Sequence, residues 1–240
     1  MFSDTPGDRI LKWVPGREPG LLRGDAHGPS GNAFDSDGRL YTCETRGRRV
    51  VRSEKDKIQV VAERWEGKRL NGPNDIVVSK NGHVYFTDPA FGSQDDLREL
   101  DFYGVYLVPP RGPMTLVAKS AGRPNGIALS PDGRVLYVTD SDEHAVRAYD
   151  LNRDGAASNE RTLISGIAGA PSGIRVDEQG NLYVAGEGLA IYSSKGRLLL
   201  TLVAGQRISN CGFGGADMKW LFLMQGPAVF RATMPAKWAY

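Results

Sequence analysis

The sequence predicts an all-β protein, a six-bladed β-propeller whose first blade is incomplete at the N-terminus. One pattern recurs along the chain: a small polar residue, a short apolar run, an Asp/Asn-Gly type of turn, and a strand led by an aromatic residue. Its copies are GPSGNAFDSDGRLYTCE (28–44), GPNDIVVSKNGHVYFTD (72–88), RPNGIALSPDGRVLYVTD (123–140), APSGIRVDEQGNLYVAG (170–186) and SNCGFGGADMKWLFLM (209–224). Repeats spaced by roughly 40 to 50 residues are typical of β-propellers, in which each repeat forms one four-stranded blade. The opening segment, MFSDTPGDRILKW, looks like the second half of a sixth copy, with Phe2 at the position of Tyr41.

The strands expected in these repeats are short, rich in β-branched and aromatic residues, and bounded by Gly, Asp, Asn or Pro. They include VVRSE (50–54), IQVVAE (58–63), IVVS (76–79), HVYFTD (83–88), GVYLV (104–108), MTLVAK (114–119), VLYVTD (135–140), AVRAYD (145–150), NLYVAG (181–186), LAIYSS (189–194) and LLLTLVA (198–204). An insertion, Ala90–Phe102, follows the second strand of its blade. The second strand of an antiparallel pair returns to the end where the first began. We therefore expect this insertion to overhang the starts of the innermost strands as a lid.

The start of the chain leaves the first blade without an innermost strand, and an unpaired strand edge invites association with another segment or chain. We expect a C-terminal segment, such as Ala228–Thr233, to pair with Phe2–Ser3 and the strand after it, or a second copy of the chain to cover the gap in a homo-oligomer.

Composition narrows the class of protein. A chain of 240 residues, 40% hydrophobic, is long enough for one domain with a sizeable core, so we expect a single domain over residues 1–240. A net charge of +2 is too balanced to indicate nucleic acid or an anionic membrane as a partner. No signal peptide or membrane span is visible, which predicts a cytoplasmic location. Cys43 and Cys211 lie in different repeats and are expected to be separate buried thiols.

The register of the repeats predicts a site. Counting back eight positions from the turn glycines at 38, 82, 133 and 180, and from Met218, gives Ser30, Asn74, Asn125, Ser172 and Asn210. Each of these residues should stand at the mouth of its blade's innermost strand, so radial repetition would place them around one end of the shaft. Amide and hydroxyl oxygens in such an arrangement suit a hard cation such as Ca²⁺.

Several segments carry a resemblance to a known family. RLNGPNDIVVSKNGHVYFTDPAFG (69–92), RPNGIALSPDGRVLYVTDSD (123–142), GIRVDEQGNLYVAGEG (173–188) and SNCGFGGAD (209–217) resemble the SMP-30/gluconolactonase/LRE-like family, and GNAFDSDGRLYTCETRGRRV (31–50) is similar to bacterial gluconolactonases. The resemblance implies a six-bladed propeller that binds one divalent metal, usually Ca²⁺, and hydrolyses sugar lactones or related esters. It covers nearly the whole chain.

The resemblance also implies a ligand set: a Glu of the first blade, the Asn of PND, the Asn of PNG and the Asp of a PDG motif. Asn74 and Asn125 match two of these ligands, Ser172 stands in place of the Asp, and the Glu position falls before Met1. Asn74, Asn125 and Ser172 are therefore the expected metal ligands, although both asparagines could instead bond only local backbone. Serine has no titrating group near neutral pH and cannot replace the Asp as a general base unaided.

The remaining roles follow from these positions. In an active site of this kind, the metal would polarise the lactone carbonyl and activate a bound water. Ser172 and Asp75 are the candidate catalytic residues, Asp75 chiefly by orienting Asn74, and the candidate substrate-binding residues are Ser30, Asn32 and Asn210. Acidic residues at the ends of second strands are expected to cap turns, although one could supply the missing base: Asp4, Glu44, Asp88, Asp140 and Glu187.

The sequence thus predicts a metal-dependent, lactonase-type hydrolase acting on a small lactone or ester, with activity that is weak, altered or lost because the family carboxylates are missing. The alternative is a non-catalytic propeller that binds a small ligand or a protein, since fold does not fix function. A third interpretation is a complete enzyme whose missing strand and acid are encoded upstream of Met1.

Overall fold

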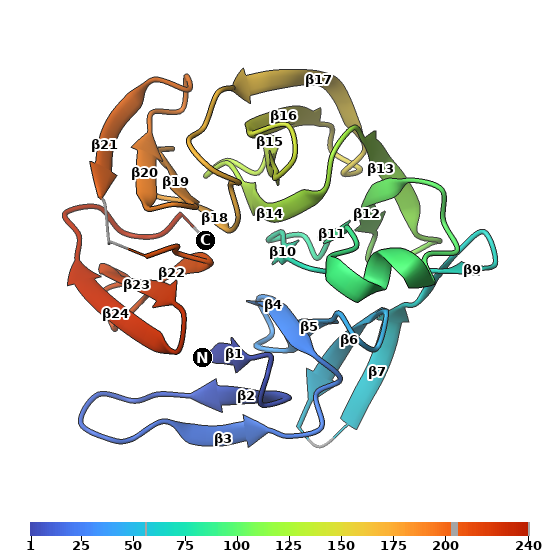
Figure 1. The fold of residues 1–240 in the computed structure, drawn as a ribbon, viewed down its shortest axis with the longest axis horizontal. Coiled ribbons are helices and arrows are strands. Elements are labelled where there is room, and N and C mark those ends of the chain that lie inside the picture. The colour runs from blue at the N-terminus through green and yellow to red at the C-terminus, as the bar shows by residue number, and fades with distance from the viewer. Residues whose placement is uncertain (56, 203–205, 240) are drawn as a thin grey trace. The chain divides into compact units, whose positions relative to one another are not determined.

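The computed structural model describes residues 1–55, 57–202 and 206–239 and divides the chain into two compact units, Met1–Lys119 and Ser120–Tyr240. Almost all of the regular structure is β-strand, arranged in antiparallel sheets that follow one another along the chain (Figure 1). The expectation of a single domain over residues 1–240 stays a prediction. The last two residues of the expected strand 198–204 lie outside the described residues.

The first unit contains three of these sheets and a small hairpin. The first sheet consists of β1 (Phe2–Asp4), β2 (Arg9–Lys12) and β3 (Gly20–Arg23). The second consists of β4 (Pro29–Phe34), β5 (Leu40–Glu44), β6 (Arg49–Glu54) and β7 (Lys57–Ala62), and the third of β10 (Ile76–Val78), β11 (Val84–Asp88), β12 (Tyr103–Val108) and β13 (Thr115–Ser120). The hairpin pairs β8 (Arg64–Trp65) with β9 (Lys68–Arg69).

The second unit contains the other three sheets. They consist of β14 (Pro124–Leu129), β15 (Val135–Asp140), β16 (Ala145–Leu151) and β17 (Ala157–Ile164); of β18 (Ile174–Val176), β19 (Leu182–Ala185), β20 (Leu189–Tyr192) and β21 (Leu198–Leu202); and of β22 (Asn210–Gly214), β23 (Trp220–Gln225) and β24 (Ala228–Thr233). Every sheet is a meander in chain order, which is the connectivity of a propeller blade.

Apolar side chains fill the space between neighbouring sheets within each unit. In the first unit, Tyr41 and Val50 of one sheet pack in the same cluster as Ile76, Phe86 and Tyr106 of the next. In the second unit, a corresponding cluster joins the β14–β17 sheet to the β18–β21 sheet. The second strand of a sheet is covered on both faces, and all five residues of β5 and of β11 are buried. These strands therefore bury polar residues as well as apolar ones, including Glu44 and Asp88.

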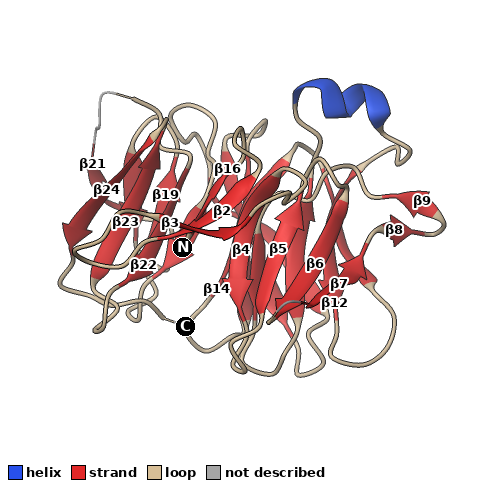
Figure 2. Ribbon diagram, turned by 90° about the horizontal axis from the view of Figure 1, so that it is seen from below, coloured by secondary structure: helices blue, strands red, loops and turns tan. Residues whose placement is uncertain are grey.

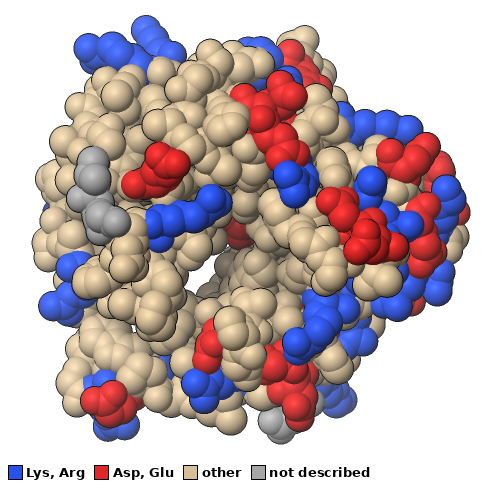
Figure 3. All heavy atoms as spheres, in the orientation of Figure 1, with Lys and Arg blue, Asp and Glu red and all other residues tan. Residues whose placement is uncertain are grey.

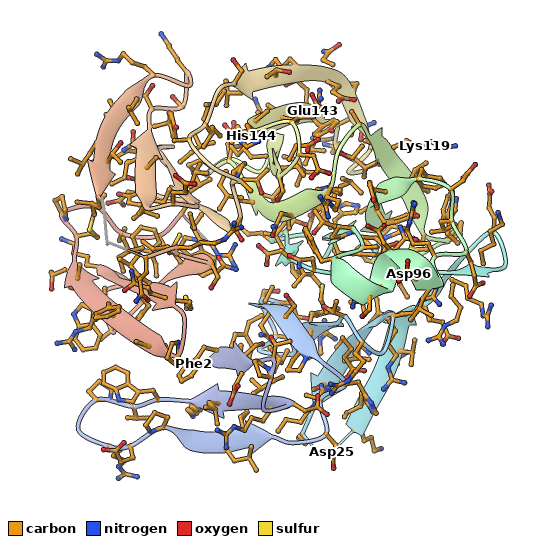
Figure 4. The ribbon with its side chains drawn as sticks, in the orientation of Figure 1. Phe2, Asp25, Asp96, Lys119, Glu143 and His144 are labelled. Atoms are coloured by element: carbon orange, nitrogen blue, oxygen red, sulfur yellow. The ribbon has the colours of Figure 1, made fainter. Side chains whose placement is uncertain are left out.

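The first sheet lacks the strand that is innermost in the four-stranded sheets, as expected. Its turn shows that β1 corresponds to β5: Asp8 has φ 53° and Arg48 has φ 55°, each after a glycine and before the next strand. Counting back from these two residues aligns Asp4 with Glu44 and Met1 with Tyr41. The expected match of Phe2 to Tyr41 was therefore wrong by one residue. Figure 4 labels Phe2 on β1.

The expected pairing between the C-terminal strand and the start of the chain was also wrong. Ala228–Thr233 forms β24, which pairs with Trp220–Gln225 inside its own sheet. The hairpin turn joining these strands is short, so local pairing closes with less loss of chain entropy than a pairing across the whole sequence would require.

The 90–102 insertion contains the 3₁₀ helix η1 (Gly92–Leu97), which lies beyond the ends of the strands in Figure 2. It contacts the segment that leads into Asn74, as expected from its position in the blade. The Glu99 carboxylate accepts a hydrogen bond from the Arg69 N–H (2.9 Å), and the carbonyl oxygen of Phe102 accepts one from the Asn71 side chain (2.9 Å). Acidic and basic side chains alternate around η1 (Figure 3), including the Arg98–Asp95 ion pair.

Both cysteines are buried and free, which confirms the prediction of two separate thiols. Burial raises the pKa of the Cys43 thiol well above its usual value. Within the described residues, no helical segment has the length and hydropathy of a membrane span.

Candidate functional site

The candidate residues lie at β-bulges where the innermost strands begin. Asn74 donates its N–H to the Thr87 carbonyl (2.9 Å), and Asp75 accepts the Thr87 N–H (3.0 Å), so two residues stand opposite one. Ser172 and Gly173 stand opposite Ala185 in the same way. The pairing of β4 with β5 shifts between Pro29 and Asn32, and that of β14 with β15 shifts between Pro124 and Ile127. Bulges re-aim side chains and are common beside active sites.

A proline precedes each of the candidates Ser30, Asn74, Asn125 and Ser172. Proline fixes φ and lacks an N–H, so it suits the first residue of a strand. Its carbonyl remains available, and at Pro29, Pro73 and Pro171 it accepts a hydrogen bond from a hydroxyl of the preceding sheet. Thr5 donates to the Pro29 carbonyl (2.6 Å), Thr45 to that of Pro73 (2.6 Å) and Ser141 to that of Pro171 (2.8 Å). These bonds fasten each strand start to its neighbour within the same unit.

In the first unit, the Gly31 N–H donates to the Asn74 carbonyl (2.7 Å), which brings the Ser30 and Asn74 bulges together. The Asn74 side chain is half-buried and, among the described residues, its carboxamide has no hydrogen-bond partner. The alternative that Asn74 serves local backbone through its side chain is therefore not what the structure shows. The Asn74 oxygen is chemically suited to bind a ligand.

Asp75 has a different environment from Asn74. It is buried, and its carboxylate accepts the N–H of Ile76 (3.0 Å). The Thr87 hydroxyl accepts the Asp75 N–H (3.1 Å). A side chain so enclosed, which accepts the N–H of the next residue, suits the orienting role. A direct catalytic role for Asp75 stays a prediction.

Ser30 and Asn32, the expected substrate-binding residues of the second sheet, are bonded to each other. Asn32 donates to the Ser3 hydroxyl (2.7 Å) and to the Ser30 carbonyl (2.9 Å), and its own carbonyl oxygen accepts from Thr42 (2.8 Å). The Asn32 carboxamide thus ties β1, β4 and β5 together. Its hydrogen bonds are used within the protein, whereas the Ser30 hydroxyl has no partner among the described residues.

In the second unit, a chain of hydrogen bonds joins Asn125 to the strand that carries Ser172. Asn125 is buried and donates its side-chain N–H to the Ser141 hydroxyl (3.0 Å), which donates to the Pro171 carbonyl (2.8 Å). The Ser172 carbonyl accepts from the Thr139 hydroxyl (2.6 Å) and the Gly126 N–H (3.1 Å). The structure therefore brings Asn125 and Ser172 together on adjacent strands.

Ser172 is nearly buried, with 8% of its surface exposed. Its backbone is fully engaged, but its hydroxyl has no hydrogen-bond partner among the described residues. The neighbouring hydroxyls, Ser141 and Thr139, hold backbone rather than the Ser172 side chain. Nothing in this arrangement activates Ser172 as a nucleophile, and its catalytic and metal-binding roles stay predictions.

In the last sheet, the hydrogen bonds show that Asn210 is not the counterpart of Ser30, Asn74, Asn125 and Ser172, as counting along the sequence had predicted. The Gly173 N–H donates to the Ser209 carbonyl (3.1 Å), just as Gly31 donates to Asn74 and Gly126 to Ser172. Ser209 is therefore the structural counterpart of the candidate position, and Asn210 is the counterpart of Asp75. The Asn210 side-chain oxygen accepts the Cys211 N–H (2.8 Å), as Asp75 accepts that of Ile76. A substrate-binding role for Asn210 stays a prediction.

Glycine is required where adjacent strand starts meet. A Cβ atom on Gly31 would lie 2.5 Å from the Asp75 side-chain oxygen and 2.6 Å from its Cα. One on Gly173 would lie 2.0 Å from the Asn210 side-chain oxygen. The larger side chain of each following strand thus occupies the space that a side chain on the preceding strand would need, which lets the two backbones bond directly.

The carboxylates at the ends of second strands mostly cap backbone, as expected. Asp4 accepts the Gly7 N–H (3.0 Å), and Asp140 accepts those of Gly122, Asp142 and Glu143. Glu44 differs, because it is buried between the guanidinium groups of Arg23 and Arg49. Asp88 accepts the N–H groups of Asn71 and Gly72, both at 2.8 Å. Burial raises the pKa of Asp88 to about 7, against the opposing effects of these two N–H groups and Arg48.

The proposed metal ligands, Asn74, Asn125 and Ser172, would present only neutral oxygens to a cation. In the described part of the chain, no group of three or more His, Cys, Asp or Glu side chains could hold a metal ion. His144 bonds the Gly169 carbonyl through Nδ1 (2.6 Å), and Figure 4 places it beside Glu143 in the turn between β15 and β16. Amide and hydroxyl oxygens can ligate Ca²⁺, but affinity rises with the number of charged ligands. Within each unit, the amide and hydroxyl oxygens are donor types that suit a weakly held hard cation.

Two functional contacts were missed by sequence reasoning: the Ser141 and Thr139 hydroxyls, which connect the Asn125 and Ser172 strands. A signal existed, because Thr45 and Ser141 follow the acidic residue at the end of a second strand in equivalent positions. Only the structure shows that these hydroxyls reach the next sheet.

Comparisons with known proteins agree with this architecture. A family model of the SMP-30/Gluconolactonase/LRE-like region matches residues 1–225. The gluconolactonase of Zymomonas mobilis is 33% identical over 247 residues, covering 89% of this chain and 69% of the relative. The lactonase drp35 of Staphylococcus aureus is 29% identical over 200 residues, covering 79% and 58%. A solved structure of a Xanthomonas campestris gluconolactonase is 35% identical with a TM-score of 0.89, covering 97% of this chain and 81% of that one.

The sheets and these similarities define the class of protein as a six-bladed β-propeller, which confirms the predicted fold. The chain belongs to the SMP-30/gluconolactonase/LRE-like family.

Proposed function

We propose that this protein is a lactonase-type hydrolase that opens sugar lactones or related esters. The observation that carries the proposal is the set of bulged strand starts in a chain that belongs to this family. Each bulge presents a small polar side chain, and relatives of the chain bear the names gluconolactonase and lactonase. The proposed substrate is a small, uncharged ring ester that carries hydroxyl groups, which amide and hydroxyl side chains can bind without a charged partner.

A divalent cation, Ca²⁺ by family resemblance, is the proposed cofactor, with Asn74, Asn125 and Ser172 as proposed ligands. Such a cation would polarise the ester carbonyl and lower the pKa of a bound water. The protein's own contribution is orientation. The bulge and the Gly31 N–H fix the backbone of Asn74, and Ser141 fixes the Asn125 side chain. A substrate-facing role for Ser30, Asn32 and Asn210, a homo-oligomer and a cytoplasmic location belong to the proposal as well.

We propose that catalysis is slow rather than fast. The position of the family Asp carries Ser172, whose hydroxyl has no hydrogen-bond partner among the described residues, and Asp75 is buried. This observation also supports the second candidate function, a propeller that binds a lactone or a related ligand without turning it over. Binding and hydrolysis must therefore be measured separately.

The test is hydrolysis of five- and six-membered aldonolactones, followed by pH-stat with and without EDTA, together with calorimetric titration of Ca²⁺ and of a non-hydrolysable cyclic ether analogue. Asn74→Ala and Asn125→Ala are the site variants, and Asn152→Ala, in an exposed turn, is the control. We expect lactone hydrolysis that EDTA lowers and that each site variant reduces. Binding without hydrolysis would favour the second function, and neither binding nor hydrolysis would refute both.

A further inference from the structure

Two fully buried carboxylates lie directly behind the two asparagine-bearing strands. Asp88 ends β11 and Asp140 ends β15, and both are 0% exposed. In a protein interior a carboxylate is retained only where polar hydrogens surround it, because an unpaired buried charge is strongly destabilising. The groups that supply those hydrogens indicate what each carboxylate holds in place.

Asp88 holds the segment that enters the Asn74 bulge. Its two oxygens accept the N–H groups of Asn71 and Gly72, each at 2.8 Å. These residues precede Asn74 by three and two positions. The backbone carbonyl of Asp88 also accepts the Asn71 side-chain N–H (3.1 Å), so Asn71 is bonded to the same residue twice.

Asp140 holds the corresponding segment before Asn125. It accepts the Gly122 N–H (3.1 Å) and the Ser120 hydroxyl (3.2 Å). Gly122 lies three residues before Asn125, which is the spacing between Asn71 and Asn74. A Cβ atom on Gly122 would lie 2.2 Å from an Asp140 carboxylate oxygen, so the backbone approaches the carboxylate as closely as a glycine allows.

Three other sheets have different residues at the position of Asp88 and Asp140. Glu44 pairs with Arg23 and Arg49, with Arg49 Nε at 2.5 Å, whereas Arg147 Nε lies 3.8 Å from Asp140. Gly186 has no side chain. In the last sheet the neutral Gln225 donates to the Gln206 carbonyl (3.0 Å). Among the described sheets, an aspartate accepts backbone N–H groups of the segment before the innermost strand in the two sheets whose innermost strands carry Asn74 and Asn125.

We propose that Asp88 and Asp140 are positioning residues that set the Asn74 and Asn125 side chains for binding the ligand of the proposed hydrolase. The proposal rests on the proposed function of those asparagines. When ionised, each carboxylate at a rigid strand end makes charge-assisted hydrogen bonds, which are strong and directional. They fix the backbone two or three residues ahead of each bulge, and the bulge then determines where the side chain points.

The variants that test this are Asp88→Asn and Asp140→Asn, each of which keeps the side chain's size but offers one acceptor oxygen instead of two. Asp177→Asn is the matched control. Asp177 is also 0% exposed and accepts two backbone N–H groups at 2.9 Å, from Gln179 and Asn181. Those bonds lie in the turn after β18, at the end of that strand remote from Ser172.

Two measurements separate positioning from general stability. Hydrogen exchange with mass spectrometry reports the amides of residues 69–75 and 120–126, and Ca²⁺ affinity and lactone kcat/KM report the site, both well below the melting temperature of every variant. Asp88→Asn should speed exchange in 69–75 and lower affinity and kcat/KM by roughly 10- to 100-fold, the usual effect of removing a supporting carboxylate. Asp140→Asn should do the same for 120–126, and Asp177→Asn should change neither segment nor the site constants.

Exchange as slow as in wild type, or faster exchange with wild-type affinity and kinetics, would overturn the inference. So would an equal loss in Asp177→Asn, since that would show general destabilisation. Asp88→Asn tests the positioning of Asn74, and Asp140→Asn tests that of Asn125. If one of these variants fails to fold, the other still tests the inference. If the wild type hydrolyses no lactone, the proposed function fails, and exchange together with Ca²⁺ affinity still decides whether the carboxylates position the asparagines.

Discussion

Replacing Gly31 by alanine tests the close packing of adjacent strand starts. The added Cβ would lie 2.5 Å from the Asp75 side-chain oxygen, 2.6 Å from the Asp75 Cα and 2.8 Å from the Asn74 carbonyl oxygen. These distances are shorter than any normal contact, and two of the three atoms belong to the backbone. The strands must separate to admit the methyl group. Overpacking of this kind costs about 1–3 kcal/mol.

Gly212→Ala is the matched control, because Gly212 also lies in an innermost strand but has no atom within 4 Å of its Cβ position. Neither glycine has a positive φ, so alanine is conformationally acceptable at both. Removing glycine's freedom in the unfolded chain stabilises by about 0.4–1 kcal/mol. We therefore expect Gly31→Ala to be less stable than Gly212→Ala by roughly 2 kcal/mol.

Thermal unfolding followed by circular dichroism measures this difference. For a chain of this length, 1 kcal/mol corresponds to about 2–4 °C in Tm, so the two variants should differ by roughly 4–8 °C. Lactone hydrolysis should also fall in Gly31→Ala, because its N–H bonds the Asn74 carbonyl. Equal melting temperatures would refute the packing argument, since the methyl group would then have found space that the structure does not contain.

Three further outcomes follow from the site. Burial raises the pKa of Asp88 from 3.8 to about 7, so between these pH values the native state binds a proton that the unfolded chain has lost. The stability of wild type relative to Asp88→Asn should therefore fall as pH rises from 4 to 7 and level off above pH 7. A constant difference in Tm across that range would contradict this prediction. Ser172→Asp should raise Ca²⁺ affinity and increase aldonolactone hydrolysis by roughly tenfold or more. If wild-type hydrolysis is already fast and EDTA-sensitive, and the substitution slows it, then the serine serves another mechanism. Ser141→Ala should lower hydrolysis because Asn125 loses the hydrogen bond to the Ser141 hydroxyl. Thr5→Val removes the first-unit counterpart of the bond between Ser141 and the Pro171 carbonyl, and it should lower Tm without a comparable loss of hydrolysis.

The repeat pattern was sufficient to predict the blades because each sheet is a local meander. Strand length, turn glycines and aromatic spacing are all encoded within one repeat, and every observed pairing joins strands that follow one another in the chain. The four repeats with a turn glycine also gave the correct bulge residues, because the count from glycine to bulge stays inside one hairpin.

The last repeat shows where counting along a sequence stops being reliable. The β22–β23 ladder runs over five pairs, from Asn210↔Met224 to Gly214↔Trp220, and its bulge lies one pair further from the turn than in the third sheet. The turn residue Met218, with φ 56°, is the true counterpart of the turn glycines. The count failed because each strand gained a residue, and no local signal in the sequence marks that change. Contacts to the neighbouring sheet identify Ser209 instead.

Burial could not be predicted for the acidic residues, since the sequence does not say which side of a strand end faces the protein. Expected only as turn caps, Asp88 and Asp140 are entirely enclosed and hold the segments that enter the asparagine bulges. The same enclosure applies to Asp75.

The buried carboxylates of Asp88 and Asp140 therefore lie behind the two asparagines rather than at the positions of the proposed ligands. A ligand at Asn74 or at Asn125 meets a neutral amide, while the carboxylates that shape its surroundings already bind backbone N–H groups. Coulombic attraction from a carboxylate bound in this way is partly cancelled by the donors that surround it. A cation would consequently gain little from direct charge pairing, and its affinity would depend on how well the amide oxygens are oriented. This is why Ser172→Asp, which adds charge, and Asp88→Asn, which removes orientation, should shift Ca²⁺ affinity in opposite directions.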